Sequence, residues 1–479
     1  MSGDPHPGGG TDGDGPTPAD GADPARCGCA GKTPLERVVF PARERVAERL
    51  VGTGVELDPP VDAATFPRAE RVERETALVR LGGDPPPAPF ADAAAADSGV
   101  WAATERDGRE VVTLACVVAG DDAAAGDRLG DALGDAYTAL DGPRVRIGKG
   151  HTVQAPGVTG GHLWLEHLRP VGDDAAAGGR TAASVDAVHA FPALGSADQA
   201  RIAALNALND VHAAGATADR TVRPVVAAPA ADTPDPARVE AWYRAGVPDD
   251  VTVLAAAVVG HDGDGWLVGA SATAAGASDR LDPRLPDDCG VLLTRPVGGL
   301  ACFARDVADG DEGLRERGLA HLRRDGRAVA AAVAGFRPAV GERFDPAAHV
   351  ARVTDVSGEG IAGVGRLAAA SGRSLRLRRL PILEGAAAAT TPWAVPDATV
   401  ETNGPLAVAA APAVLDRLAD ELLGVDGADP RRVGTLGDDD APVVNATGTD
   451  LSRAVEAAAR WPTAATDGGE AADGGGGGG

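Results

Sequence analysis

Lysine, methionine and aromatic residues are scarce in this sequence of 479 residues. Only two of its 45 basic residues are lysines, Lys32 and Lys149, and Phe, Trp and Tyr together make up 3%. Acidic residues number 70, which gives a formal charge of −25. Because carboxylates hold hydrated cations and salt screens their mutual repulsion, this composition favours a halophilic, cytoplasmic protein.

The sequence also lacks a basic stripe and a long apolar run. Without clustered cations to neutralise phosphates, nucleic acid is excluded as a main ligand. No stretch of about 18 apolar residues offers a membrane span, and we expect no signal peptide because the basic and apolar regions of one are lacking. Five cysteines are a sparse, odd set, which favours a reduced protein with one reactive thiol over a disulfide framework.

The length predicts two or three domains, since domains typically have about 100–200 residues. Stretches rich in Gly, Asp and Pro at both ends, without apolar periodicity, predict flexible segments there. We therefore expect a disordered acidic arm at 1–26, a mobile arm with Cys and Lys at 27–40, an N-terminal domain at 41–285 with a long extra segment before residue 172, a C-terminal domain at 286–463, and a disordered Gly-rich tail at 464–479.

Short apolar segments predict strands, and longer periodic segments predict helices. Strands are expected at 111–118, 180–191, 221–228, 252–259, 266–273 and 402–410. Helices are expected at 196–216, 313–335, 360–371 and 411–423, and loops at 83–97 and 228–238. In the first of these helices, Ile202, Leu205 and Leu208 recur at helical spacing and a glycine stands near the end.

Lys32 follows Cys29 by three residues, and glycines lie beside both. A thiolate is a strong nucleophile, and a nearby ammonium favours the thiolate and pairs with phosphates. These residues are therefore candidates for catalysis. The alternatives are a solvated cysteine at the edge of a disordered arm, or a metal site, although Cys27 and Cys29 without further partners make a poor zinc site.

The second lysine lies in the Gly-rich segment 148–152. Such a loop lets backbone N–H groups approach a phosphate, so Gly150, His151 and Thr152 are candidates for phosphate binding. The GxxxxGK[ST] spacing is absent, so the segment is not a Walker A motif. A plain turn is the alternative reading.

Several aspartates lie at the ends of predicted strands and helices, namely Asp173, Asp174, Asp186, Asp210 and Asp355. Carboxylates that converge on one point bind Mg²⁺ and, through it, the phosphates of a nucleotide. Because aspartate is abundant here, any single one could equally be solvated surface. Asp210 differs from the others, since it lies within a largely apolar helix.

In order along the chain, these segments resemble those of selenophosphate synthetase (selenide, water dikinase), a family of the aminoimidazole ribonucleotide synthetase superfamily. The family's Gly-Cys-x-x-Lys is similar to 28–32, its Asp-Asp-Ala-Ala to 173–176, and its Arg-Ile-Ala-Ala-x-Asn-Ala-x-Ser-Asp helix to 201–210. Its Leu-Leu-Thr-Lys-Pro-Leu-Gly is similar to 292–298, and its Thr-Asp-Val-Thr-Gly-Phe-Gly to 354–360.

The resemblance implies an α+β fold of two domains, aminoimidazole ribonucleotide synthetase-like (PurM-like), with mixed sheets flanked by helices. It implies that ATP, selenide and water give selenophosphate, AMP and phosphate in a homodimer, with Mg²⁺ as cofactor. Cys29 and Lys32 would be catalytic, and Asp174, Asp210 and Asp355 would hold the metal. ATP would be bound in the N-terminal domain by Lys32, Gly172, Asp173, Asp186, Asp210, Gly150, His151 and Thr152.

The sequence departs from the family in its loops. The loop at 148–152 precedes the helix at 196–216, whereas the family's counterpart follows it, where Gly260-His261-Asp262 is a weaker candidate. The family's late Gln-Thr-Ser-Gly-Gly-Leu is replaced by Glu401-Thr402-Asn403-Gly404-Pro405-Leu406. Two alternatives therefore stay open: another ATP-dependent enzyme of the superfamily with a different small acceptor, such as sulfide, and a catalytically silent nucleotide-binding regulator.

Overall fold

The computed structural model describes the chain mainly between residues 175 and 445. Within this part the description is interrupted at 179–180, 192–193, 262–265, 277–287, 310–311, 340–341, 359, 362–363, 366–367, 369–371, 387–398 and 441–442. Earlier in the chain it covers strands within 99–171 and the single positions Arg45, Glu48, Asp127 and Asp131. The expected arms at 1–26 and 27–40 and the tail at 464–479 lie outside the described residues.

The described strands form three sheets. A four-stranded sheet has the order β1 (Gly99–Arg106), β2 (Arg109–Val118), β4 (Val158–Leu165), β3 (Val153–Ala155). A seven-stranded sheet has the order β10 (Ala257–His261), β8 (Ala218–Pro229), β11 (Leu267–Ala275), β7 (Thr181–His189), β6 (Ala175–Gly178), β5 (Arg169–Val171), with β9 (Thr252–Val253) also pairing with β8. A six-stranded sheet has the order β13 (Arg352–Asp355), β15 (Leu406–Ala410), β12 (Gly290–Leu293), β16 (Arg431–Gly437), β14 (Ser374–Leu377), β17 (Val443–Asn445).

The two larger sheets are mixed. Strands β9 and β10 run parallel to β8, and β17 runs parallel to β14, whereas the other described pairs are antiparallel. Helices accompany the sheets: α5 (Ser196–Ala213), α6 (Pro236–Gly246), α7 (Gly299–Asp309), α8 (Glu312–Leu322), α9 (Arg327–Ala334) and α11 (Pro412–Leu422). The expected α+β class, with mixed sheets flanked by helices, is confirmed.

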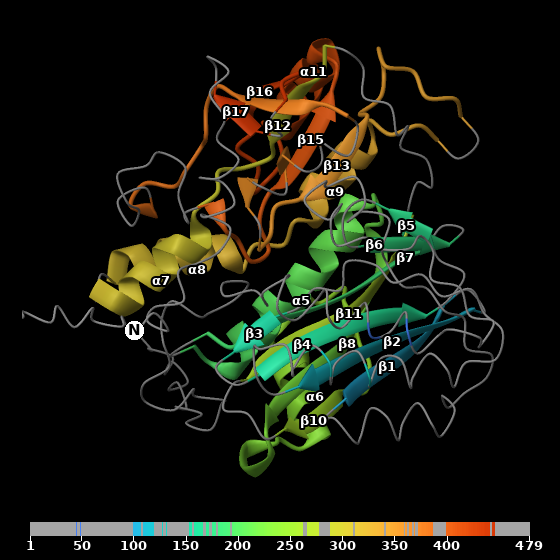
Figure 1. The fold of residues 1–479 in the computed structure, drawn as a ribbon, viewed down its shortest axis with the longest axis vertical. Helices are drawn as coiled ribbons and strands as arrows, with labels where there is room; N and C mark the ends of the chain where they lie inside the picture. The colour runs from blue at the N-terminus through green and yellow to red at the C-terminus, as the bar shows by residue number, and fades with distance from the viewer. Residues whose placement is uncertain are drawn as a thin grey trace, which may run out of the picture.

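Helix α5 lies between the seven-stranded sheet at one end of the molecule and the six-stranded sheet at the other (Figure 1). It contacts β7 and β11 on one side and α9 and β13 on the other. Its buried residues run from Gln199 to Ala213 almost without interruption, as expected for a helix enclosed on all sides. It ends just before Gly215, whose φ of +86° is the left-handed conformation that stops helices.

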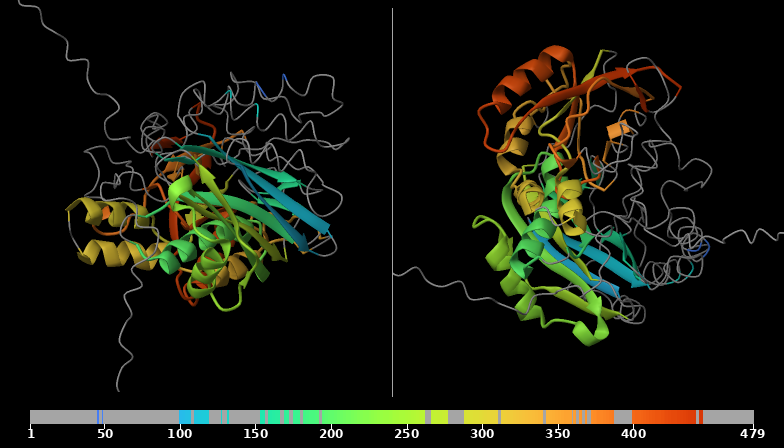
Figure 2. Two further views of the ribbon diagram at one scale, coloured as in Figure 1. Left: turned by 90° about the horizontal axis from the view of Figure 1, so that it is seen from below. Right: turned by 90° about the vertical axis from the view of Figure 1, so that its left-hand side faces the viewer.

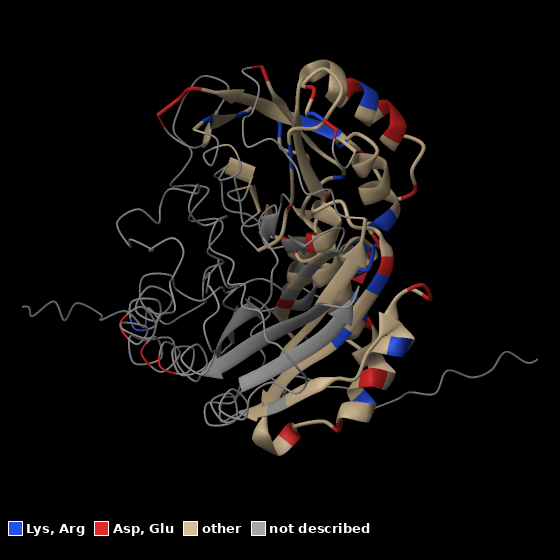
Figure 3. Cartoon of the chain, turned by 90° about the vertical axis from the view of Figure 1, so that its right-hand side faces the viewer, with Lys and Arg blue, Asp and Glu red and all other residues tan. Residues whose placement is uncertain are grey.

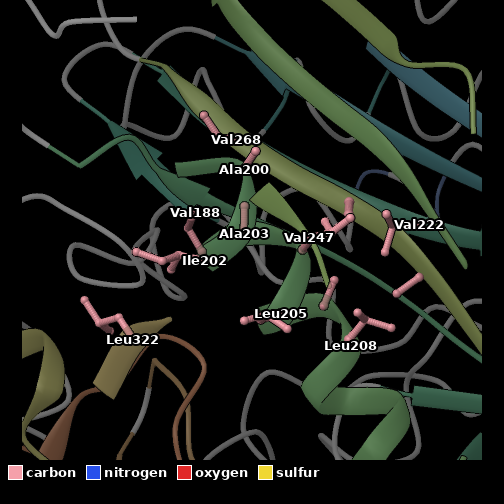
Figure 4. Packing of buried hydrophobic residues seen from close by; sticks show 14 of the residues in the cluster. Val188, Ala200, Ile202, Ala203, Leu205, Leu208, Val222, Val247, Val268 and Leu322 are labelled. Atoms are coloured by element: carbon pink, nitrogen blue, oxygen red, sulfur yellow. The ribbon is translucent and has the colours of Figure 1, made fainter. Parts of the chain in front are cut away.

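Small side chains let α5 and the seven-stranded sheet approach closely. Figure 4 shows Ala200 and Ala203 of α5 beside Val268 of β11, within one apolar cluster that also includes Leu322 of α8. At Gly269, a Cβ atom would lie 2.2 Å from the carbonyl oxygen of Asp186 on the neighbouring strand. The sheet therefore needs glycine at this position to keep β11 against β7.

The four-stranded sheet lies alongside the seven-stranded sheet (Figure 2). Strand β1 contacts β8 and β10, while β3 and β4 contact β7. The extra segment before residue 172 thus contributes strands that cover part of the N-terminal sheet. Strand β11 is buried along nearly its whole length, with α5 packed against it and Tyr243 of α6 donating to the Gly269 carbonyl.

Four expectations about secondary structure were wrong in detail. The strand expected at 402–410 begins only at Leu406. The strand expected at 252–259 is two strands, β9 and β10, which both pair with β8. Three residues separate Val253 from Ala257, whereas only two separate their partners Val222 and Val225, so the chain bulges by one residue between β9 and β10. The loop expected at 228–238 contains the start of α6, where Asp235 caps the backbone N–H of Ala237.

The helix expected at 313–335 is two helices, α8 and α9, separated at 323–326. Asp325 lies in the interruption, where its side chain accepts from the backbone N–H of Arg327 at the start of α9 and from the guanidinium of Arg220. The helix at 196–216 is confirmed as α5, and that at 411–423 as α11.

Charged residues on the described chain fall mainly on loops and on outer helix faces, such as that of α11, while the strands carry few (Figure 3). Among the described helices, none combines the length and the apolar character that crossing a bilayer requires.

Candidate functional site

Asp186 lies in the middle of β7, where it pairs with Ala270 of β11. Its Oδ1 accepts a hydrogen bond of 2.8 Å from the backbone N–H of Ala187, and its Oδ2 accepts one from the Asn206 side chain. The residue is 4% exposed. A buried carboxylate in the centre of a strand is costly unless it is hydrogen-bonded, so this position is specifically built to hold an acid.

Asp210 occupies the last turns of α5 and is as deeply buried as Asp186. Its Oδ2 accepts a hydrogen bond of 2.5 Å from the Ser184 hydroxyl on β7, two residues before Asp186. The helix and the strand therefore bring both aspartates to one region. The surface alternative considered for Asp186 and Asp210 is wrong.

Asp355 is the last residue of β13 and is also buried. Its strand contacts α5, and it pairs with Leu406, the first residue of β15. The two residues before Leu406 form a close junction: Pro405 accepts from the Val356 N–H at 2.8 Å, and a Cβ at Gly404 would lie 1.8 Å from the Val356 carbonyl oxygen.

The same junction reaches α5. The Asn209 side chain, next to Asp210, donates a hydrogen bond of 3.1 Å to the Gly404 carbonyl. The end of β13 with Asp355 and the end of α5 with Asp210 therefore both border the loop 401–405. Of the aspartates picked out in the sequence, the structure buries Asp186, Asp210 and Asp355, and it connects the strand end and the helix that carry Asp355 and Asp210 through the loop 401–405.

The other predicted site residues lie outside the described part of the chain. These are Cys29, Lys32, Gly150, His151, Thr152, Gly172, Asp173 and Asp174. Of the weaker loop candidate, Gly260 and His261 end strand β10. A Cβ at Gly260 would lie 2.7 Å from the Thr233 hydroxyl and 3.1 Å from the Cα of Ala230, so this glycine packs closely against the turn that follows β8.

The loop 401–405 carries a buried polar network that the sequence did not reveal. The backbone N–H of Asn403 donates to Oδ1 of Asn206 at 2.5 Å, and its side chain donates to the carbonyls of Leu322 (2.7 Å) and Arg324 (2.9 Å) at the end of α8. Its own carbonyl accepts from Arg295. The sequence predicted a strand at 402–410, whereas β15 begins at Leu406 and the residues before it form a buried loop.

Glu401 binds the N-terminus of α7. Its Oε1 accepts from the backbone N–H groups of Gly298 and Gly299, the latter at 2.8 Å, and its Oε2 accepts from Leu300 at 3.2 Å. Complete burial raises the pKa of this carboxyl to about 7, although these N–H groups and the Arg295 charge favour the ionised form. A helix N-terminus stabilises such a carboxylate through its dipole.

Two other ionisable groups share this environment. His321 Nε2 lies 3.7 Å from Oε1 of Glu401, and burial lowers the pKa of His321 well below its usual value. Burial also lowers the pKa of Arg295 to about 10. The histidine is therefore neutral near pH 7, and Arg295 supplies the positive charge that faces the carboxyl.

A second polar cluster joins the two parts of the chain beside the C-terminal end of α5. Arg220 of β8 makes two hydrogen bonds to Asp325, of 2.8 and 2.9 Å, and one of 2.6 Å to Asp250. Arg327 binds the other oxygen of Asp250 at 2.7 Å. Since Arg220 is 1% exposed, this cluster is an internal connection between β8 and the start of α9.

The comparisons with known proteins gave only distant likenesses. The chain is similar to thiamine-monophosphate kinase from Stenotrophomonas maltophilia K279a, at 17% identity over 57% of this chain and 89% of that one, with a TM-score of 0.42. It is also similar to HypE, a hydrogenase maturation protein from E. coli, at 14% identity over 56% and 82%, with a TM-score of 0.42.

A third likeness is to HypE in complex with ATP, at 14% identity over 57% of this chain and 84% of that one, with a TM-score of 0.40. No family model and no curated protein matches the sequence. These TM-scores are too low to assign an activity or a ligand to this chain.

Proposed function

We propose that this chain is a Mg·ATP-dependent phosphotransferase, and that its acceptor is selenide, giving selenophosphate, AMP and phosphate. The observation that supports the proposal is that Asp186, Asp210 and Asp355, distant in sequence, are all buried and all linked to the loop 401–405. The links run from Asp186 through Asn206, from Asp210 through its neighbour Asn209, and from Asp355 through its pairing with Leu406. The motif resemblance at 28–32, 173–176 and 201–210 supports ATP as the phosphoryl donor and selenide as the acceptor.

Asp210 and Asp355 would hold Mg²⁺, since both present carboxylate oxygens, the ligands that this ion prefers. Among the described residues, no group of three or more His, Cys, Asp or Glu is placed to hold a metal. The proposal therefore requires a further oxygen ligand from Asp174 or from the nucleotide itself. When bound, the ion would neutralise the charge of the phosphates.

The remaining contacts to ATP are assigned from the resemblance. Asp186 would orient the nucleotide from β7, together with Gly172 and Asp173, which precede β6 in the sequence. Lys32 would pair with the phosphates as a cation. For the loop over the phosphates, the proposal takes Gly150, His151 and Thr152, with 260–262 as the alternative.

Cys29 would hold the selenide at the reacting phosphate, because a thiolate is a soft nucleophile that suits a soft anion. Residues 27–40 would close over the site and exclude water, so that the acceptor competes with hydrolysis. The boundary of the two domains at 285/286 and the homodimer remain predictions of the same resemblance.

The proposal is tested by ³¹P NMR of the purified protein in molar KCl with Mg·ATP and anaerobic selenide. Wild type is compared with Cys29→Ser, Lys32→Ala and Asp210→Asn. We expect a selenophosphate resonance together with AMP in wild type, and loss of both in the Lys32 and Asp210 variants.

Other outcomes identify the alternatives. Turnover of ATP that ignores selenide but responds to another acceptor, such as sulfide, would assign the chain a different reaction of the same type. Nucleotide binding without turnover, unaffected by Cys29→Ser, would make the chain a regulator. Full activity of Asp210→Asn would contradict the assignment of that residue.

A further inference from the structure

Asn206 lies on the face of α5 that points at Asp186, and its two amide atoms face different parts of the fold. Its Nδ2 donates to Oδ2 of Asp186 on β7, and its Oδ1 accepts from the backbone N–H of Asn403 at 2.5 Å. We propose that Asn206 is the positioning residue that orients the Asp186 carboxylate for the nucleotide, and that Asn403 holds Asn206 in place. The inference rests on the proposed function.

The orientation of the Asn206 amide follows from the partners at its two ends, Asp186 and Asn403. A backbone N–H can only donate, so it requires the amide oxygen, and a carboxylate can only accept, so it requires the amide N–H₂. A flipped amide would face donor with donor and acceptor with acceptor. With the residue 1% exposed, water cannot replace either hydrogen bond, and the amide keeps one orientation.

Asn403 is itself fixed from three sides. Its φ of 53° is the left-handed conformation that asparagine tolerates better than most residues. Its side chain binds the last carbonyls of α8, and its backbone carbonyl accepts from Arg295. The N–H that meets Asn206 therefore points in a set direction, and it comes from the loop that leads into the six-stranded sheet.

Two hydrogen bonds hold the Asp186 carboxylate, one on each oxygen. The one to Oδ1 comes from the Ala187 N–H and is local, whereas the one to Oδ2 depends on Asn206 and, through it, on Asn403. Rotation of the carboxylate is thus controlled from the second half of the chain. The loop 401–405 therefore acts on the nucleotide site through Asn206 and Asp186, and it needs no contact of its own with the nucleotide.

The test measures the affinity for Mg·ATP of wild type, Asn206→Asp and Asn206→Ala at about pH 8 and about pH 5.5 in molar KCl. Asn206→Asp keeps the acceptor for Asn403 but places a second carboxylate against Asp186. We expect its affinity at the higher pH to fall by about tenfold or more, as for loss of a buried charge-assisted hydrogen bond.

At the lower pH the affinity of Asn206→Asp should return towards wild type. Two carboxyls in contact resist double ionisation, so one takes up a proton, and the protonated group donates to Asp186 as the amide did. Asn206→Ala, the matched variant without a donor, should stay weak at both pH values. A residue that only maintained packing would show no such recovery.

Affinity of Asn206→Asp within about twofold of wild type at both pH values, or loss without recovery as in Asn206→Ala, would overturn the inference. Asn403→Gly keeps the left-handed φ and the backbone N–H but loses the side-chain hydrogen bonds to the end of α8, so it should weaken Mg·ATP binding less than Asn206→Ala. An equal or larger loss of affinity would contradict the idea that Asn403 acts on Asp186 only through Asn206.

Failure of the proposed function gives a different result. Wild type that binds no Mg·ATP refutes that function, and the inference is then judged by urea unfolding without nucleotide. Destabilisation of Asn206→Asp that is relieved at about pH 5.5 supports the role of Asn206 towards Asp186. Destabilisation of Asn206→Asp that is equal at both pH values overturns that role. The same unfolding curves show whether each variant folds.

Discussion

The buried carboxyl of Glu401 makes a testable contribution to how stability depends on pH. It sits at the N-terminus of α7, bound by three backbone N–H groups, and burial raises its pKa to about 7 from the usual 4.5. We consider Glu401→Gln, which keeps the size of the side chain and an oxygen acceptor for Gly298 and Gly299 but cannot ionise.

The sign of the effect follows from the raised pKa. Between about pH 4.5 and 7 the folded protein retains the proton that the unfolded chain has released, so stability falls as pH rises in this range. The contribution of the Glu401 carboxyl to the free energy of unfolding is fully present below about pH 4.5 and is lost as pH rises through about 7. At about 1.4 kcal/mol per pH unit, the whole change is about 3 kcal/mol.

The assay is urea unfolding of wild type and Glu401→Gln at about pH 5 and about pH 8, in constant KCl. The free energy of unfolding of wild type relative to the variant should decrease by about 2–3 kcal/mol from the lower to the higher pH. Titration of other groups occurs in both proteins and largely cancels.

Glu384→Gln, at an exposed position in the same part of the chain, is the control for the change in net charge. It should leave the difference from wild type nearly independent of pH, because exposed charges interact weakly. A difference between wild type and Glu401→Gln that stays constant within about 1 kcal/mol between the two pH values would refute the reasoning.

Two further variants test the connections around α5. Arg220→Leu removes the arginine that binds Asp325 and one of the two arginines that bind Asp250, and should destabilise the protein by about 1–3 kcal/mol in urea unfolding. Arg432→Leu, from an exposed pair with Asp416, should cost about 0–1 kcal/mol; equal costs would contradict this. Gly404→Ala places a Cβ 1.8 Å from the Val356 carbonyl oxygen, so it should lower the free energy of unfolding by at least about 1–3 kcal/mol and weaken Mg·ATP binding. Gly424→Ala, where the nearest atom lies 3.7 Å away, should do neither.

The sequence predicted the elements with strong local signals. Helix α5 was found because apolar residues recur at Ile202, Leu205 and Leu208, and because Gly215 ends it. Strands β7, β8 and β11 were found from their apolar runs. The start of α6 was missed although Asp235 followed by proline is a helix-start signal, since that stretch was judged by its overall Pro, Ala and Asp content.

The candidate site was predictable only where the acids themselves carried the signal. Asp210 and Asp355 could be singled out by their places near the ends of elements, whereas Asp186, expected at a strand end, lies in the middle of β7; the structure buries all three. Their partners could not be found in this way. Asn206 and Asn403 are 197 residues apart, and no local pattern tells that a helix amide and a loop N–H will meet, because that contact depends on how the two halves pack.

The loop 401–405 connects three features that are far apart in the sequence. Glu401 binds the first N–H groups of α7, Asn403 binds α8 and Asn206, and Gly404 accepts from Asn209. Each contact is buried, so displacing the loop leaves several polar groups without partners at once, at about 1–3 kcal/mol for each. The loop therefore cannot shift relative to α5 without breaking several buried hydrogen bonds. The positions of Asp186 and Asp210 thus depend on the position of the six-stranded sheet, which the loop leads into.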